Sequence, residues 1–379
     1  QWSGGVDGAA YARDWGVFYT GRSIFIANGE DRNNIKVAYN LPPKWHVTTP
    51  WNADLKAAEK ADYHFTVNNF TELSTAIFFA GLHKEITVKR GDYELVLALG
   101  GDKLMARSDE FKKLTEGVFD YYVQLMGGSP RLPAGNKQKR TVVVLNPGSV
   151  SDGEALGNNI SILLHEGDEM SEVIARFIFA HEFFHLWNGK SFSPNSDKLE
   201  WLKEGFSNYY TLKALHHVGY LNDDSYLSLL AGFFYQKYDS DEGVGKLSMT
   251  DGEQKHDHWG LVYGGGFFVG IAQDMIIRSA TGNQKSLDDL MRTLFNRYGG
   301  TDQQYAFDEI QKELSALSKI DQSGFIDTYV KGVKRLPLDK YLLMAGVNSS
   351  HDNNKLTLTK NKQMTADQQG LLLGLFGKK

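Results

Sequence analysis

Two histidines four residues apart, on a strongly apolar helical segment, constrain this chain more than any other feature. Residues 171–188 carry apolar side chains at helical spacing, and His181, Glu182 and His185 form the pattern His-Glu-x-x-His within them. Residues four apart lie about 6 Å along the helix axis on one face, so both imidazoles can reach one metal ion. Neutral imidazoles suit zinc, and the intervening Glu182 would lie within reach of a water molecule. The pattern predicts a metal-binding helix.

The flanking residues and a downstream acid decide between this interpretation and two histidines on an exposed helix. Phe183, Phe184 and Trp187 are too apolar to be exposed together. The chain has no cysteine, so zinc ligands must be histidines and carboxylates. A catalytic zinc keeps three protein ligands and one open position. Glu204, with eighteen residues between it and His185, has the chemistry to complete a site for one ion.

Local patterns predict an α+β chain with a β domain first. Alternating runs at 35–39, 85–88 and 93–97 lie between Gly, Pro and Asn residues, and Gly91-Asp92 predicts a hairpin turn. We expect a sandwich-like β domain over residues 1–104, then a mainly helical domain over 105–335, and a polar tail over 336–379. Strands are expected at 141–145 and 160–164, and helices at 109–125, 171–188, 201–216, 223–238, 262–280, 285–298, 305–317 and 321–332.

Composition excludes several function classes. At 379 residues the chain is too long for one ordinary domain. Its net charge of -5, with scattered cations, gives no footprint for nucleic acid. No uninterrupted apolar run approaches the roughly 18 residues of a membrane span, so we expect no transmembrane segment. The chain starts at Gln1 rather than Met, which suggests a removed signal peptide or a trimmed sequence; a periplasmic or secreted location is slightly favoured over a cytoplasmic one.

The sequence around the histidines resembles a known group of peptidases. His-Glu-x-x-His followed by Glu after eighteen residues is similar to the gluzincins. The longer stretches 181–190 and 201–210 resemble the glycyl aminopeptidase family within that group. Weaker similarities to the same family occur at 41–50, 262–266, 286–291 and 336–346.

The resemblance implies a fold, an activity and a set of roles. It implies a thermolysin-like catalytic domain that hydrolyses peptide bonds with one zinc ion. The zinc ligands would be His181, His185 and Glu204, with Glu182 as the base that activates water and Tyr263 as the hydroxyl that stabilises the transition state. The substrate would be a peptide or protein that loses N-terminal residues, with small ones such as Gly or Ala favoured.

Two further residues have open roles. Asn208, one turn after Glu204, either orients a ligand histidine or is an exposed helix residue. An aminopeptidase must bind the substrate's α-ammonium in a partly dry cleft, which requires a carboxylate. Glu154 is favoured over Asp152 for this anchor because it lies closer to the family's glutamate position; the alternative is a solvated loop beside an open cleft.

The sequence also departs from the family pattern. The residues after Leu336 are too few for the family's PDZ-like module, and Gly265 stands where the family carries Lys. The family's Gly-Gly-Leu-Glu-His segment has no clean equivalent, since Glu154 is shifted. Three alternatives therefore remain open: an endopeptidase, a zinc hydrolase of non-peptide substrates, and a catalytically inactive gluzincin-fold binding protein.

Overall fold

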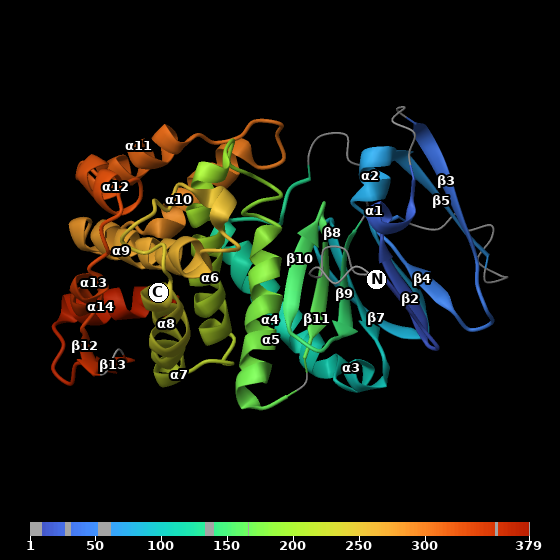
Figure 1. Cartoon of the computed structure of the whole chain (residues 1–379), viewed down its shortest axis with the longest axis horizontal. Helices are drawn as coiled ribbons and strands as arrows, with labels where there is room; N and C mark the ends of the chain where they lie inside the picture. Colours follow the sequence, from blue (N-terminus) through green and yellow to red (C-terminus); the bar gives the residue numbers. More distant parts are fainter. Residues whose placement is uncertain are drawn as a thin grey trace. The chain divides into compact units, whose positions relative to one another are not determined.

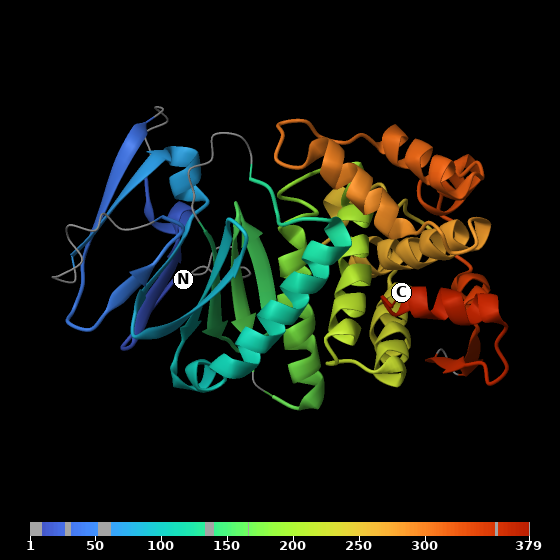
Figure 2. The ribbon, with the colours of Figure 1, turned by 180° about the vertical axis from the view of Figure 1, so that it is seen from behind.

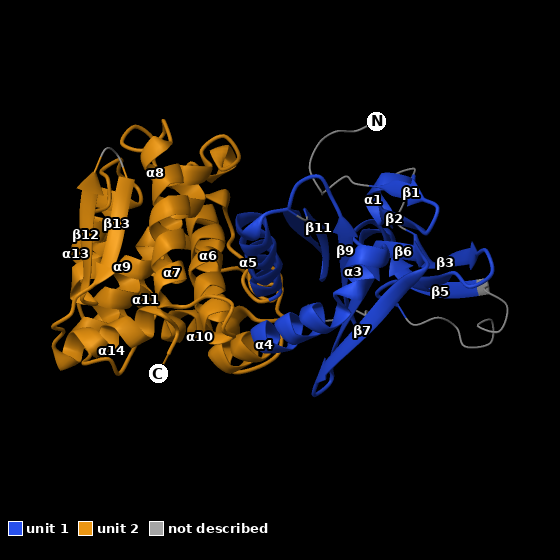
Figure 3. Ribbon diagram, turned by 90° about the horizontal axis from the view of Figure 1, so that it is seen from below, with its two compact units in different colours: residues 1–119, 132–186 blue, residues 120–131, 187–379 orange. Residues whose placement is uncertain are grey.

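The computed structural model describes residues 10–26, 32–51, 62–132, 140–165, 167–352 and 355–378. Contacts divide the chain into two compact units (Figure 3). The first unit comprises residues 1–119 and 132–186, and the second comprises residues 120–131 and 187–379.

The first unit is built mainly from layered β-sheets (Figure 1). One antiparallel sheet has the strand order β1-β2-β6-β4, and a mixed sheet has the order β10-β11-β9-β8-β7. Strands β3 and β5 form a separate pair. The elements are β1 Tyr11–Arg13, β2 Gly16–Thr20, α1 Gly21–Ile24, β3 Asn33–Asn40, β4 His46–Thr48, β5 Asp62–Asn69, α2 Phe70–Ser74, β6 Ile77–Gly81, β7 His83–Arg90, β8 Tyr93–Gly100, α3 Asp102–Ala106, α4 Ser108–Met126, β9 Thr141–Pro147, β10 Asp152–Leu156, β11 Asn159–Leu164 and α5 Glu169–His185.

Strand β6 joins these layers because both of its faces are buried. Successive strand residues point to opposite faces. Phe78 and Ala80 pack into a core with residues of β3 and β5, whereas Ile77 and Phe79 pack into a second core with residues of β8 and β9. The chain therefore stacks sheet upon sheet, and the predicted α+β class with a sandwich-like N-terminal part is confirmed.

The predicted hairpin forms, with β7 pairing β8 in the register Arg90↔Tyr93 around Gly91-Asp92. Strand β8 also pairs in parallel with β9, through Leu95↔Thr141 and its successors. The predicted division after residue 104 thus falls between strands that share a sheet. The local sequence could not predict the pairing of β8 with β9, because hydrogen bonds between strands some 45 residues apart leave no periodic pattern. The three predicted domain ranges remain predictions.

Helices α4 and α5 cover the face of the mixed sheet opposite the antiparallel sheet, and Figure 2 shows α4 beside its strands. Tyr93 of β8 stacks on Phe119 of α4, with ring centroids 5.4 Å apart. Helix α5 packs on β10 and β11, and its Phe179 contacts Phe111 of α4. Asp168 caps the start of α5 by accepting a hydrogen bond from the Ser171 amide at 2.9 Å.

The second unit is mainly helical, and the helices predicted within it are confirmed to within a few residues. Two segments are π-helical, which periodicity did not predict. The elements are η3 Asp197–Leu199, α6 Glu200–His217, α7 Asp223–Leu229, η4 Leu230–Tyr235, α8 Gln236–Ser240, η5 Gly252–Gln254, η6 Gly260–Gly264, α9 Gly265–Ala280, α10 Leu287–Tyr298, α11 Phe307–Ser318, α12 Ser323–Tyr329, α13 Leu338–Met344, β12 Val347–Asp352, β13 Lys355–Lys360 and α14 Ala366–Leu375.

The C-terminal segment, expected only as a polar tail, folds into a helix, a hairpin and a second helix. Strands β12 and β13 pair from Val347↔Lys360 to Asp352↔Lys355. Phe376 is buried and its ring stacks on that of His216 of α6, with centroids 4.9 Å apart. The few apolar residues at the end of the chain therefore serve to fasten this segment to α6.

One helical stretch, Gly260–Ala280, is long and apolar enough to span a membrane, with a mean hydropathy of 1.4. Three polar residues, Gln273, Asp274 and Arg278, interrupt this stretch. The sequence therefore contains no uninterrupted apolar run of this length. Within the fold, 89% of the apolar window is buried against protein. Such burial is typical of the central helix of a globular unit.

Candidate metal centre

Helix α5 brings the two motif histidines together in the first unit. The Nε2 atoms of His181 and His185 lie 3.0 Å apart, and the rings meet edge to face at 88°. Both side chains are buried, as is Glu182. One ligand atom from each of the three residues lies within 4.8 Å of the others. The spacing of four residues thus has the geometric result that the sequence predicts.

This arrangement fits a zinc ion. Zinc–nitrogen bonds of 2.0–2.1 Å in a tetrahedral site place two ligand atoms about 3.3 Å apart. The separation of the two Nε2 atoms, 3.0 Å, is close to that value. Two imidazoles and a nearby carboxylate on a buried helix are donors that suit zinc better than Ca²⁺ or Mg²⁺, which favour oxygen.

Strand β10 runs directly beside Glu182. A Cβ atom on Gly153 would lie 2.6 Å from Glu182 Cγ and 2.9 Å from Ile178 Cγ2. Only glycine permits this approach of the strand to the helix. Because side chains alternate along a strand, Glu154 points to the other face, where Arg22 Nη2 donates to both its carboxylate oxygens at 3.0 and 2.9 Å. The structure therefore pairs the predicted anchor residue with an arginine.

Glu204 lies on α6 in the second unit and belongs to a cluster of four charged side chains. Its Oε1 is 3.2 Å from Lys255 Nζ and 3.5 Å from Lys203 Nζ. Glu200, one turn earlier, contacts the same ammonium groups at 2.6 and 2.5 Å. Both carboxylates are buried. Burial lowers the pKa of Lys255, but the two carboxylates together outweigh it and raise that pKa above its ordinary value.

Neither Glu200 nor Lys255 was singled out from the sequence. Glu200 has a detectable signal, because it lies four residues before Glu204 and so shares its helix face. Lys255 has none, since it lies in a polar stretch fifty-one residues away in sequence. Only the tertiary fold assigns it to the carboxylates.

Tyr263 lies on η6, also in the second unit. Its ring stacks on that of Trp259, with centroids 5.2 Å apart and an interplanar angle of 5°. Asn208 of α6 donates its side-chain amide to the Tyr263 carbonyl at 3.3 Å. Asn208 is buried, and its hydrogen bond joins α6 to η6. Its predicted role of orienting a ligand histidine remains a prediction.

Helices α6 and α9 meet without intervening side chains. A Cβ on Gly205 would lie 2.2 Å from the Gly266 carbonyl carbon, and one on Gly266 would lie 2.0 Å from the Trp201 oxygen. This backbone contact comes directly after Glu204 on α6 and three residues after Tyr263 on the other helix. The contact between the two helices therefore helps to position Glu204 and Tyr263 within the second unit.

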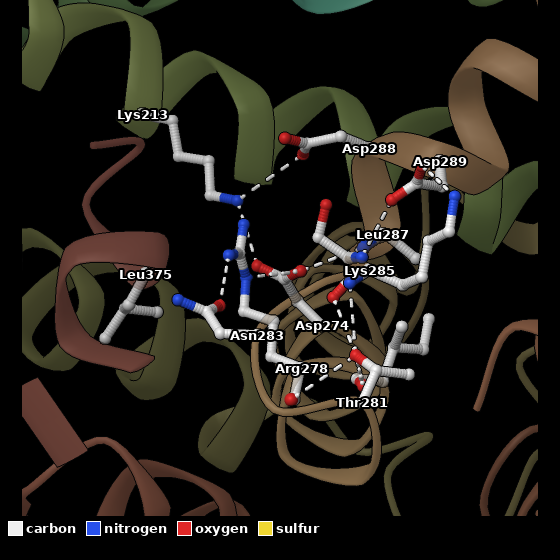
Figure 4. Close-up of polar contacts among 12 residues, drawn as sticks. Lys213, Asp274, Arg278, Thr281, Asn283, Lys285, Leu287, Asp288, Asp289 and Leu375 are labelled. Carbon is white, nitrogen blue, oxygen red and sulfur yellow. Dashed lines mark hydrogen bonds and ion pairs between the residues drawn. The ribbon is translucent and has the colours of Figure 1, made fainter. Parts of the chain in front are cut away.

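A buried charge network further along α6 locks the same helices (Figure 4). The Asp274 carboxylate of α9 is 3.0 Å from Lys213 Nζ of α6 and 3.0 Å from Arg278 Nε. It also accepts hydrogen bonds from the Tyr209 hydroxyl and the Leu287 amide at 2.7 and 2.9 Å. Burial raises the pKa of Asp274, but Lys213, Arg278 and these donors hold it well below its usual range.

Comparisons with known proteins give a matching family and similar solved structures. Residues 175–264 match the M61 glycyl aminopeptidase family. An aminopeptidase N family protein from Idiomarina loihiensis has a similar structure, with a TM-score of 0.76 and 19% identity. The alignment covers 92% of this chain and 64% of that one, so this chain spans less than two thirds of it. No curated protein matches the sequence. The predicted resemblance to the glycyl aminopeptidase family is confirmed.

Proposed function

We propose that this chain is a zinc-dependent peptidase, because its residues 175–264 match the M61 glycyl aminopeptidase family. The observation that carries the proposal is the 3.0 Å approach of the His181 and His185 Nε2 atoms on a buried helix. Glu204 is the proposed third ligand. In support, Asn188, three residues beyond His185, donates to the Lys203 carbonyl at 2.9 Å and so ties the following turn to α6.

The proposed reaction is hydrolysis of a peptide bond. Zinc, when bound, supplies Lewis-acid polarisation and lowers the pKa of a water molecule towards about 7. Glu182 accepts the proton of the attacking water and later delivers it to the leaving amine. The Tyr263 hydroxyl donates a hydrogen bond to the oxygen that becomes negative in the transition state. A periplasmic or secreted location remains a prediction.

The assignment of Glu204 as a ligand is tested by replacing two carboxylates one turn apart. Glu204→Ala is expected to lose zinc, because two histidines alone hold the ion weakly, and Glu200→Gln is expected to keep it. Metal content after dialysis, measured by atomic emission, distinguishes the two. Full zinc stoichiometry in Glu204→Ala would show that Glu204 is not a ligand. Loss of zinc from Glu200→Gln alone would assign the ligand role to Glu200.

The Tyr263 hydroxyl is tested by Tyr263→Phe, which keeps the ring and its stacking on Trp259. We expect kcat to fall by about 10²–10³ with zinc content unchanged, since the lost hydrogen bond forms only in the transition state. Steady-state kinetics on a fluorogenic peptide gives kcat and KM separately. A change confined to KM would show that Tyr263 packs against the substrate without stabilising the oxyanion.

The position of cleavage is the finer part of the proposal. Removal of small N-terminal residues requires an anchor for the α-ammonium, and Glu154 is the proposed one. Its ion pair with Arg22 favours a second candidate, an endopeptidase with an open cleft, because the carboxylate already has a cationic partner. Comparing a free-amine peptide with its N-acetylated twin separates the two. Equal rates would contradict aminopeptidase activity, and an unaffected Glu154→Gln variant would contradict the anchor.

A further inference from the structure

A second cluster of potential metal ligands lies in the first unit, on two edge strands. Strand β4 ends the antiparallel sheet, and β7 ends the mixed sheet. His46 and Thr48 share one face of β4, and His83 and Glu85 share one face of β7, because residues two apart on a strand point the same way. The patterns His-x-Thr and His-x-Glu therefore place four donor side chains opposite one another.

Ring and hydrogen-bond contacts join these side chains. The imidazole rings of His46 and His83 stack with centroids 3.9 Å apart. The Thr48 hydroxyl lies 2.5 Å from His83 Nε2 and also donates to the Glu85 carboxylate. Ligand atoms of His46, His83 and Glu85 all lie within 4.8 Å of one another. His83 is buried, His46 is half-buried and Glu85 is exposed, so the cluster opens to solvent on one side.

The hydrogen bonds of this cluster orient the ring of His83. His83 Nδ1 lies 3.2 Å from the Gly81 carbonyl, which only accepts, so Nδ1 holds the ring proton. The single Thr48 proton goes to the Glu85 carboxylate, which also only accepts. His83 Nε2 then faces the Thr48 hydroxyl oxygen with its lone pair.

With Nδ1 engaged by the Gly81 carbonyl, the Nε2 atom of His83 is the one that faces the cluster. The Nδ1 hydrogen bond to a backbone carbonyl is also the contact that commonly orients a metal-binding histidine.

We propose that His46, His83 and Glu85 bind a divalent transition-metal ion of the zinc type at the junction of β4 and β7. Two imidazoles and a carboxylate form a donor set that zinc accepts, and their ligand atoms lie within 4.8 Å of one another. Rotation of the Thr48 hydroxyl away from His83 Nε2 would open that nitrogen to the ion. This site is separate from α5 and does not depend on the proposed peptidase function.

The proposed ion would link the edge strands of two different sheets. Edge strands expose unpaired backbone groups, and proteins commonly protect them. Strand β4 has only three residues and pairs only with β6 among the described strands, so few backbone hydrogen bonds hold it. Ligands from both edges would couple β4 to β7 directly. We therefore assign the site a structural role, with bound metal raising the stability of the first unit.

The test uses the full chain with the α5 histidines removed. In the metal-stripped His181→Ala/His185→Ala protein, titration with Zn²⁺ is expected to show one remaining equivalent and a higher Tm. Adding His46→Ala or Glu85→Gln should weaken this binding by more than the roughly 10–100-fold that loss of an outer-shell partner costs. The control is His64→Ala, which removes an exposed histidine of β5 in the same unit.

Direct observation completes the experiment if the double variant does not fold. Crystals of the wild-type protein with Zn²⁺ should show an anomalous peak, at the zinc edge, between His46, His83 and Glu85. Either no binding in the α5-deficient protein, or equal affinity with and without His46 and Glu85, would overturn the proposal. An anomalous map of a zinc-loaded crystal without a peak at this junction would overturn it as well.

Discussion

Glu182→Gln is expected to retain zinc and to lose about 10²–10⁴ in kcat, the usual cost of removing a general acid–base group. Glutamine has the same shape, so it fits the narrow space between α5 and Gly153 of β10. It cannot accept a proton, however, and the attacking water then keeps its proton. The measurement is kcat on a fluorogenic peptide, together with metal content in the same preparation.

A matched control lies on the same helix. Glu172→Gln makes the same chemical change about three turns earlier, in the first turn of α5. There Glu172 forms an ion pair with Arg107. Its rate should stay close to that of the wild type. Near-wild-type turnover by Glu182→Gln would refute the proposed mechanism. Loss of zinc from this variant would instead show that its carboxylate is a ligand.

Asp274→Asn is expected to produce the largest loss of stability. The carboxylate is completely buried and offsets the charges of Lys213 and Arg278, which would be left buried without it. Removing one partner of such a group costs about 3–5 kcal/mol of unfolding free energy. For a unit of about 200 residues this lowers Tm by roughly 6–20 °C. Differential scanning calorimetry measures the shift.

An exposed pair supplies the control for this prediction. Asp327→Asn breaks the solvent-exposed contact with Lys331, and such pairs contribute about 0–1 kcal/mol. A shift no larger for Asp274→Asn than for Asp327→Asn would show that the buried network adds nothing. The pH dependence has a definite sign, because the pKa of Asp274 is lowered by folding. Its contribution should be complete above about pH 4 and be lost as the pH falls further.

Local chemistry made much of the molecule predictable. Helix α5 could be predicted because its apolar period and its histidine spacing both require a helix, and the hairpin at Gly91-Asp92 because turn residues separate two alternating runs. The C-terminal helix α14 was missed, although Thr365 forms a capping box with Gln368 at its start. Its short apolar run gave no clear period, so only packing within the second unit reveals it.

The sequence by itself determined the elements whose signal is contained within about twenty residues: the helix of the candidate metal ligands His181 and His185, the carboxylate on the next helix and the β-rich start. Tertiary structure alone decided the partners that lie far apart in sequence. It joined Lys255 to Glu204, paired Glu154 with Arg22, and brought the edge strand of His46 to that of His83. The physical reason is that side-chain period records which face of an element is buried, whereas the identity of the opposing element depends on packing the whole unit.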